Sequence, residues 1–241
     1  MFVSGVERTV AWARKHQRTL SIAVVAVILL VAGFLYYVNY QRTLETQATQ
    51  RFTELQGTIA SGNFQLAIRD LQGFVDRFGS TEAGRQARLV LAEILLQEGQ
   101  ARRAGEVLGT LAEDVDEPLG MAAARVQAAA FEAVGDHEQA IRLYLRIADA
   151  ARFPFQARES LADAARVRLQ NGDADAAADL YERVLGTFDT DEAGRGYFEM
   201  WLAEARARAA AGGNAAPLAP GVSPDPVGPD TGSLDTDAGQ P

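Results

Sequence analysis

The pattern Gly135-Asp136-His137-Glu138-Gln139-Ala140 recurs at three other places in the chain and indicates how the chain folds. Similar stretches begin at Gly62, Gly99 and Gly172, so the four glycines are spaced 37, 36 and 37 residues apart. An alanine stands five residues after each of these glycines. A fixed period of this length indicates a protein built from stacked structural repeats.

Other positions keep the same spacing from each glycine. Large apolar or aromatic side chains stand nine residues later at Leu71, Leu108, Tyr144 and Tyr181, and twelve residues later at Phe74, Leu111, Ile147 and Val184. Seven residues before the glycines stand Leu55, Ala92, Ala128 and Ala165. These offsets fall on one face of a helix. We therefore expect each glycine to permit a tight turn between two antiparallel helices, and the alanines to let these helices approach closely.

The pattern predicts four helical pairs and one further helix. The expected pairs are residues 42–61 and 63–78, 82–98 and 100–113, 119–134 and 136–150, and 155–171 and 173–187. A final helix over 192–211 would close the array, because a repeat array needs a terminal element with a polar outer face. Glu199, Glu204, Arg206 and Arg208 would supply that face, while Tyr197, Trp201 and Leu202 would face the array.

This arrangement resembles the helix-turn-helix unit of tetratricopeptide repeats, and the resemblance covers about residues 42–212. It implies an all-α fold in which helical hairpins stack into a solenoid. Two features depart from the family pattern, since no tryptophan opens a repeat and no proline closes one. The period also exceeds the usual 34 residues, which predicts longer turns between the repeats.

A strongly apolar segment precedes the repeats. Residues 20–38 read LSIAVVAVILLVAGFLYYV, in which Ser21 is the only polar member and no residue is charged. As a helix this segment would extend roughly 28 Å, close to the thickness of the hydrocarbon core of a bilayer. Eleven Ile, Val, Leu or Phe side chains between positions 22 and 38 favour insertion by about 3 to 7 kcal/mol. We therefore predict a transmembrane helix over residues 20–40, with Tyr36, Tyr37 and Tyr40 at one interface.

The charges beside the apolar segment predict its orientation. Against a single Glu7, four basic residues precede it: Arg8, Arg14, Lys15 and Arg18. The positive-inside rule then keeps residues 1–19, a basic leader, in the cytoplasm and exports everything after residue 40. A cleaved signal peptide is the alternative, but bulky apolar residues continue after its best cleavage site near Gly33.

The two ends of the exported region differ in composition. Between Phe34 and Gly57 no proline or glycine interrupts the chain, so the apolar helix can continue into the first repeat helix. Residues 213–241 hold six of the eight prolines, four aspartates and no Lys or Arg. Such a sequence cannot bury enough apolar surface to offset its ordering entropy, and we predict a disordered tail. This tail keeps the chain soluble or, alternatively, offers an acidic docking segment.

The composition excludes several kinds of chemistry. The 241 residues include no cysteine and only two histidines, His16 and His137, so disulfides, thiolate sites and multi-histidine metal centres are excluded. The net charge of -9 argues against nucleic acid as a general partner. The sequence has no Walker-type loop, GxGxxG motif or GxSxG elbow. We expect no enzyme activity, no cofactor, no metal and no small-molecule substrate.

Two features are candidates for metal binding or catalysis. Glu113, Asp114, Asp116 and Glu117 form a dense acidic group, and carboxylates can bind a hard cation. Their spacing does not match a Ca²⁺ loop, so a solvated loop between repeats is the favoured interpretation. His137 stands in a turn stretch where a packing role is favoured over a catalytic one.

What remains is binding by the repeat array. Stacked helical pairs form a concave groove lined by the first helix of each pair. The polar residues predicted to face this groove are Gln86, Glu93, Arg125, Glu132, Glu159 and Arg166. Their mixed charges specify no ligand, and ordinary solvated helix residues are the alternative interpretation.

The whole layout resembles the YfgM-like family of bacterial inner-membrane proteins over about residues 5–212. The resemblance rests on the basic leader with Val6, Glu7 and Trp12, the single span, and the stretch from Gly79-Ser80-Thr81 through Leu95. It implies a single-pass protein of the bacterial inner membrane, with a cytoplasmic N-terminus and a periplasmic repeat domain over 42–212. It further implies an ancillary role at the SecYEG translocon together with a periplasmic membrane-anchored chaperone.

A coordinator of envelope biogenesis or cell division is the alternative function. Such a protein would also bind partners through its repeats without catalysis. The mass of the mature protein would discriminate between the two, because cleavage near Gly33 would release a soluble form.

Overall fold

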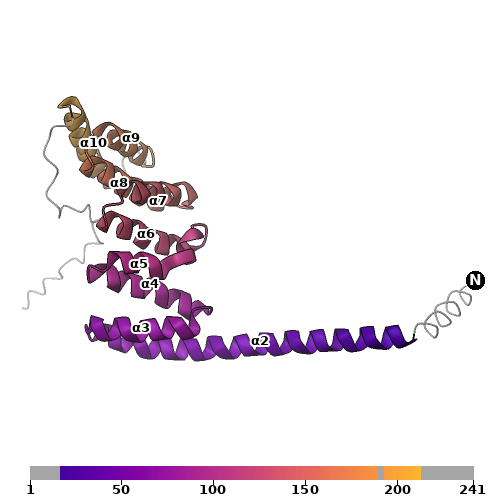
Figure 1. Ribbon diagram of the computed structural model, residues 1–241. Coiled ribbons are helices and arrows are strands. Elements are labelled where there is room, and N and C mark those ends of the chain that lie inside the picture. Colours follow the sequence, from indigo (N-terminus) through magenta and orange to yellow (C-terminus); the bar gives the residue numbers. More distant parts are fainter. Residues whose placement is uncertain (1–16, 189–192, 213–241) are drawn as a thin grey trace, which may run out of the picture. The chain divides into compact units, whose positions relative to one another are not determined.

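The computed structural model describes residues 17–188 and 193–212, with side chains from Ile28 onward. These residues form an all-α repeat fold of nine α-helices and one short 3₁₀ helix (Figure 1). The elements are α2 (Gln17–Ala60), α3 (Phe64–Phe78), α4 (Glu82–Gln97), α5 (Ala101–Leu108), η1 (Gly109–Glu113), α6 (Pro118–Ala133), α7 (His137–Ala150), α8 (Pro154–Gln170), α9 (Ala174–Leu185) and α10 (Arg195–Ala210). The predicted leader through residue 16 and the predicted tail over 213–241 lie outside the described residues.

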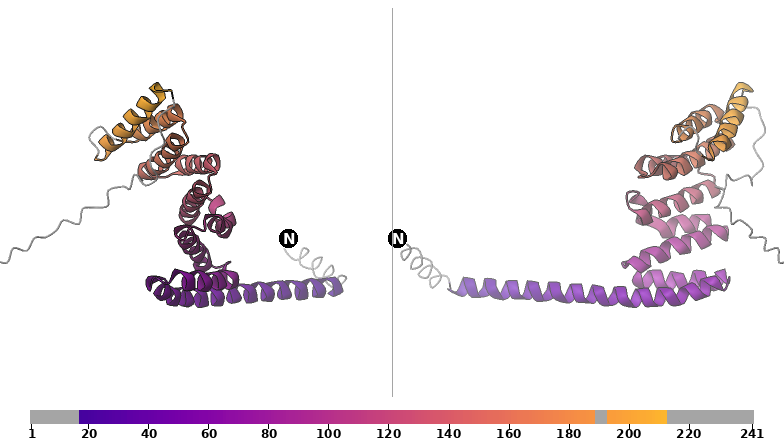
Figure 2. Two further views of the ribbon diagram at one scale, coloured as in Figure 1. Left: turned by 60° about the vertical axis from the view of Figure 1, so that its left-hand side comes forward. Right: turned by 180° about the vertical axis from the view of Figure 1, so that it is seen from behind.

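The chain divides into two compact units, Met1–Ala151 and Arg152–Pro241. In the first unit each helix contacts the next along the chain from α2 to α7, and the first helices of successive pairs also touch, α2 with α4 and α4 with α6 (Figures 1 and 2). In the second unit α9 contacts both α8 and α10. The four predicted helical pairs and the final helix are therefore confirmed. The first predicted helix, 42–61, forms the C-terminal part of the longer α2, and the other boundaries differ by a few residues.

The four repeat glycines form the turns within the pairs. Their φ angles are 74°, 73°, 83° and 84°, in the left-handed region that only glycine enters without strain. In three turns the next residue's N–H also donates to a carbonyl five residues back, as from Asp136 to Phe131 at 2.8 Å. The side chains of Asn63, Asp136 and Asp173 then cap the second helix of their pair.

The repeated apolar positions form the core. The alanine five residues after each glycine is 0 or 1% exposed, and the large side chains nine and twelve residues after it are all buried. Seven residues before the glycines, Ala92, Ala128 and Ala165 are fully buried, whereas Leu55 of α2 is half-buried. The small residues lie where two helices of a pair meet, and the larger ones fill the space beside them.

The predicted longer turns between repeats are wrong. Three residues separate α3 from α4, and four separate η1 from α6. The long period resides in the helices instead, since α4 and α6 each have 16 residues. Gly84 and Gly120 permit these short links, because a Cβ atom at either position would lie 1.9 Å from a backbone carbonyl oxygen, that of Phe78 or of Asp114.

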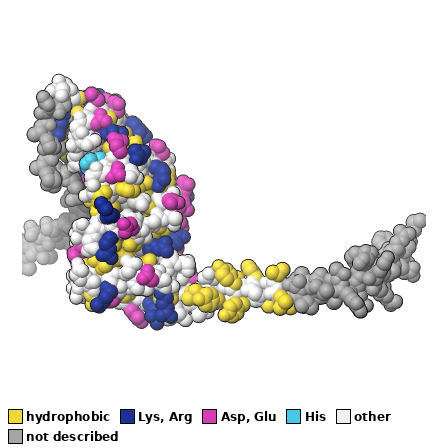
Figure 3. Space-filling view, in the orientation of Figure 1, with side chains coloured by type: hydrophobic (Ala, Val, Ile, Leu, Met, Phe, Trp, Pro, Cys, Tyr) yellow, Lys and Arg dark blue, Asp and Glu magenta, His cyan; other side chains and the backbone are white. Residues whose placement is uncertain are grey.

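α2 is one uninterrupted helix, as the sequence allowed. Its last turns pack against α3 and α4, where Ala48 and Phe52 are buried. Towards its N-terminus large apolar side chains lie on the surface, with Phe34 and Tyr36 exposed by 65% and 75% (Figure 3). Side chains of residues 20–27, the first part of the predicted span, lie outside the described set. Within the part of the chain that is described, no helix has both the length and the apolar character needed to cross a bilayer.

The final helix closes the second unit. Trp201 and Leu202 are buried as predicted, and the indole of Trp201 stacks on Tyr181 of α9 with ring centroids 6.4 Å apart. Tyr197 remains 36% exposed at the edge of this cluster. On the polar side, Arg206 forms an ion pair with Glu182 of α9 at 2.6 Å, so this predicted surface residue also ties α10 to its neighbour.

Candidate protein-binding surfaces

The first unit holds four of the six residues predicted to line a groove. Gln86 and Glu93 lie two turns apart on α4 and are both exposed, with the half-buried Leu89 and Val90 between them. Partial desolvation by neighbouring side chains raises the pKa of Glu93 above its ordinary value. A row of two polar and two apolar side chains is chemically able to contact a protein segment, and none of its groups has the arrangement of a catalytic pair.

The other two candidates of this unit lie on α6. Arg125 is exposed and Glu132 is half-buried, and both already interact with neighbouring residues. Counted from the turn glycines, they stand three residues further along the repeat than Gln86 and Glu93. The equivalent positions on α6 are Ala122 and Ala129, so the polar row of α4 does not continue in register.

The second unit holds the remaining two candidates, Glu159 and Arg166 on α8. Both are half-buried and both have interaction partners. The Arg166 side chain is only 13% exposed and forms an ion pair with Asp163 at 3.6 Å. Arg166 therefore contributes more to the packing of this unit than to an open surface, which differs from its predicted position.

Two hollows lie on another side of the first unit, between successive second helices. The first, of about 510 Å³, lies between α3 and α5 and is lined by residues that include Arg88, Arg103 and Gln72. The second, of about 450 Å³, is lined by residues of η1, α6 and α7, which include Arg142 and Arg146. Gly109 lines both hollows, so they are adjacent. None of the six predicted groove residues lines either one.

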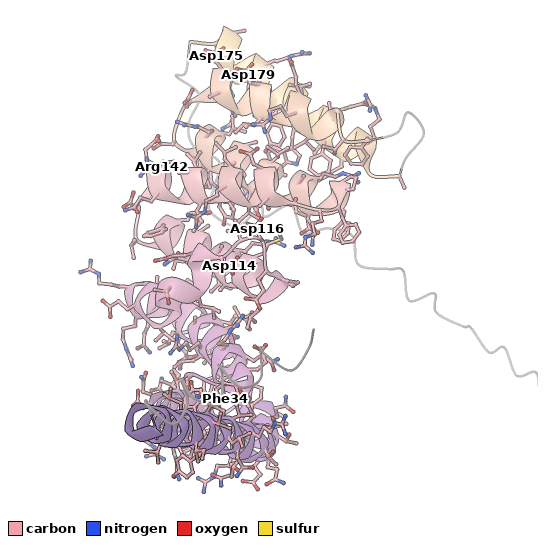
Figure 4. The ribbon with its side chains drawn as sticks, turned by 90° about the vertical axis from the view of Figure 1, so that its right-hand side faces the viewer. Phe34, Asp114, Asp116, Arg142, Asp175 and Asp179 are labelled. Carbon is pink, nitrogen blue, oxygen red and sulfur yellow. The ribbon has the colours of Figure 1, made fainter. Side chains whose placement is uncertain are left out.

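The acidic link between η1 and α6 is held by structural contacts. Glu117 forms an ion pair with Arg85 of α4, and the carbonyl of Asp114 packs against Gly120. Figure 4 shows Asp114 and Asp116 at this link. Over the described ranges, no three His, Asp or Glu side chains are grouped so that they could hold a metal ion.

His137 is the first residue of α7, next to the capping residue Asp136. Its side chain is half-buried, and its Nδ1 atom is buried without a hydrogen-bond partner in the described part of the chain. This position beside a turn is consistent with the packing role that the sequence favoured.

Comparison with known proteins agrees with this geometry. A family model described as a tetratricopeptide repeat-like domain matches residues 11–206, and the chain belongs to this family. Solved structures of nearly identical TPR-like repeats attributed to a kinesin light chain of Podosopora anserina share the fold. One matches with a TM-score of 0.53 and 21% identity, covering 72% of this chain and 87% of the other, and its Q17M variant matches with a TM-score of 0.52 and the same identity and coverage. No curated protein matches the chain.

The family and the fold define the class of protein. It is a helical repeat scaffold of the kind that binds other proteins and is typically non-catalytic. No enzyme family matches the chain.

Proposed function

We propose that the protein is a membrane-anchored scaffold whose repeats bind protein partners in the periplasm. Residues 20–40 would span the bacterial inner membrane once, with the N-terminus in the cytoplasm. The scaffold would be an ancillary subunit of the Sec translocon and would link it to periplasmic chaperones.

The main support for a membrane anchor is the exposed apolar surface of α2. Nine large side chains that no described element covers lie between Ile28 and Tyr40: Ile28, Leu29, Leu30, Val31, Phe34, Leu35, Tyr36, Tyr37 and Tyr40. A continuous apolar surface of this kind is unfavourable in water and favourable in lipid. Because the three tyrosines stand at the end nearest the repeats, their rings suit the interface at which the helix leaves the bilayer.

Two further features support this arrangement. The basic residues of the leader favour a cytoplasmic N-terminus by the positive-inside rule. The family match begins at residue 11, so one family model includes the apolar segment together with the repeats. An apolar segment that belongs to the family domain is more readily explained as an anchor than as a signal peptide removed during export.

The role at the translocon rests on the resemblance to the YfgM-like family. It is tested by crosslinking in native membranes followed by mass spectrometry, with photoreactive residues at Leu30 in the apolar segment and at Gln86 in the array. We expect the Leu30 probe to recover translocon subunits and the Gln86 probe to recover a periplasmic chaperone.

A matched control replaces residues 20–38 with an unrelated apolar span, keeps the photoreactive residue at position 30 and keeps the repeats. This control should lose the translocon crosslinks and keep those of the array. Recovery of neither translocon nor chaperone subunits above background would remove the proposed role. Recovery of proteins of wall or outer-membrane assembly in their place would favour the alternative function in envelope biogenesis.

A further inference from the structure

The two adjacent hollows between the second helices concentrate basic side chains. Each contains two arginines and one glutamate, although the chain as a whole carries a net charge of -9. The arginines come from α4, α5 and α7, and Figure 4 shows Arg142 on the last of these helices. We call this surface the arginine face, defined by Arg88, Arg103, Arg142 and Arg146.

Arg88 distinguishes the arginine face from an ordinary solvated surface. It is half-buried, and its guanidinium lies against Gly79, where a Cβ atom would be 2.8 Å away. Among the described residues it forms no ion pair or hydrogen bond, whereas Arg85, one turn earlier on α4, pairs with Glu82 and Glu117. No Arg88 nitrogen is among the fully buried atoms that lack a partner. The guanidinium therefore remains accessible to an anion supplied from outside the described chain.

The other side chains of the two hollows are suited to a peptide. Gln72, Gln127 and Gln139 line them, and their amide groups can both donate to and accept from a peptide backbone. Guanidinium groups bind carboxylates through two parallel hydrogen bonds. Glu106 and Glu113 also line the hollows and would repel a continuous row of phosphates, whereas carboxylates separated by neutral residues can avoid them.

We propose that the arginine face binds an acidic, extended segment of a partner protein. Two carboxylates of this segment would contact Arg88 and Arg103, and the segment would continue along α5 towards Arg142. None of the six predicted groove residues lines this surface, although Arg88 comes from α4, the first helix of its pair. This surface adds a partner chemistry to the proposed scaffold but does not depend on the membrane anchor. A negative result for peptide binding would therefore leave the proposed topology of the anchor intact. A wrong topology would likewise leave the proposed peptide binding intact.

The test measures binding of a defined probe to the full-length chain in detergent. The probe is a fluorescein-labelled twelve-residue peptide of alternating Asp and Ala, followed by fluorescence anisotropy at low and at physiological salt. We expect saturable binding that weakens as salt increases, because exposed charges are screened. The double variant Arg88→Gln/Arg103→Gln should bind at least about tenfold more weakly, since it loses hydrogen bonds to charged groups.

The matched control variant is Arg69→Gln. Arg69 lies on α3, is 77% exposed and lines neither hollow, so its removal should change the affinity less than about twofold. Circular dichroism and the unfolding midpoint of each variant establish that the arrays remain folded. An Asn–Ala peptide of the same length should not bind.

Several outcomes would overturn the proposal. One is the absence of saturable binding of the Asp–Ala peptide to the native chain. Another is an equal loss of affinity in Arg69→Gln and in the double variant. A third is equal affinity for the Asn–Ala peptide. A single-stranded oligonucleotide that binds as tightly as the acidic peptide would assign the face to nucleic acid. A several-fold gain in affinity on removal of residues 213–241 would assign it to the chain's own acidic segment.

Discussion

At the scale of single residues, the fold depends on where glycine is required and where alanine is required. Each turn glycine adopts a positive φ, and the alanine five residues later is buried where two helices meet. Neither position accepts a larger side chain without cost. A Cβ atom strains the left-handed turn, and a larger side chain at the alanine position overfills the contact between helices.

Gly135→Ala is expected to destabilise the protein by about 1 kcal/mol, because the φ of Gly135 is 83° although no atom lies within 4 Å of a new Cβ. The matched control is Gly73→Ala, at an exposed position inside α3 where a Cβ also meets nothing. This change should stabilise by roughly 0.5 to 1 kcal/mol, since alanine is the better helix former. Chemical unfolding of both variants in detergent gives the comparison, and a shift of the same sign in both would contradict the account.

A pH dependence is expected from Tyr181, which is 2% exposed. Burial raises the pKa of its phenol, nearby Tyr197 and Asp163 add to the effect, and Arg166 opposes it. In the unfolded chain a tyrosine ionises near pH 10. Ionisation therefore favours the unfolded state once the pH exceeds about 10, and stability should fall there but not near neutrality. Between pH 8 and pH 11 the unfolding midpoint should fall less for Tyr181→Phe than for the native chain. Equal falls would disprove the contribution of Tyr181 to the pH dependence of stability.

At the scale of the elements, α2 belongs to two environments. Its last turns form the first helix of the array, and the Glu45 carboxylate accepts the backbone N–H of Glu82 at 3.2 Å, which ties α2 to the start of α4. Only a few residues earlier its apolar side chains are uncovered. Because the helix is continuous between these regions, no turn separates the apolar segment from the part of α2 that packs against α3 and α4.

Thr43→Pro should break this continuity, because proline removes the hydrogen bond to residue 39 and clashes with its carbonyl. The chain contains no cysteine, so spin labels can be attached to the pair Tyr36→Cys and Thr53→Cys without other changes. We expect one narrow distance distribution near about 25 Å for the native helix. The distribution should be broad after Thr43→Pro and narrow after Thr43→Ala, and a narrow distribution in the proline variant would contradict a single rigid helix.

The sequence predicts the elements well, because the period and the turn glycines are local signals. The short links were missed because they depend on Gly84 and Gly120, whose role is a close approach of backbone to backbone. Their own spacing of 36 residues was the signal that could have revealed them. Helical periodicity assigns a face to the six groove candidates, but it does not reveal the ion pair between Arg166 and Asp163 or the shifted register of Arg125. Arg88 could not be recognised either, because an absent partner is visible only in three dimensions.

At the scale of the whole molecule, the charge distribution separates the functions we propose. The basic residues before the apolar segment favour a cytoplasmic N-terminus, and the acidity belongs to the region after it. The repeat units supply surfaces for protein partners, and the described residues contain no group arranged as a metal site. In this proposal one uncleaved helix spans the membrane and anchors the protein-binding repeats on its far side.

Labelling of single cysteines in cells with a membrane-impermeant maleimide tests that claim most directly, because the native chain has no cysteine and provides an unlabelled control. Ser61→Cys places the thiol at an exposed position of the first turn, and Ser4→Cys places it in the leader. We expect labelling of Ser61→Cys when only the outer membrane is permeable, and of Ser4→Cys only after the inner membrane is disrupted. Equal labelling of both positions, or the reverse order, would contradict it.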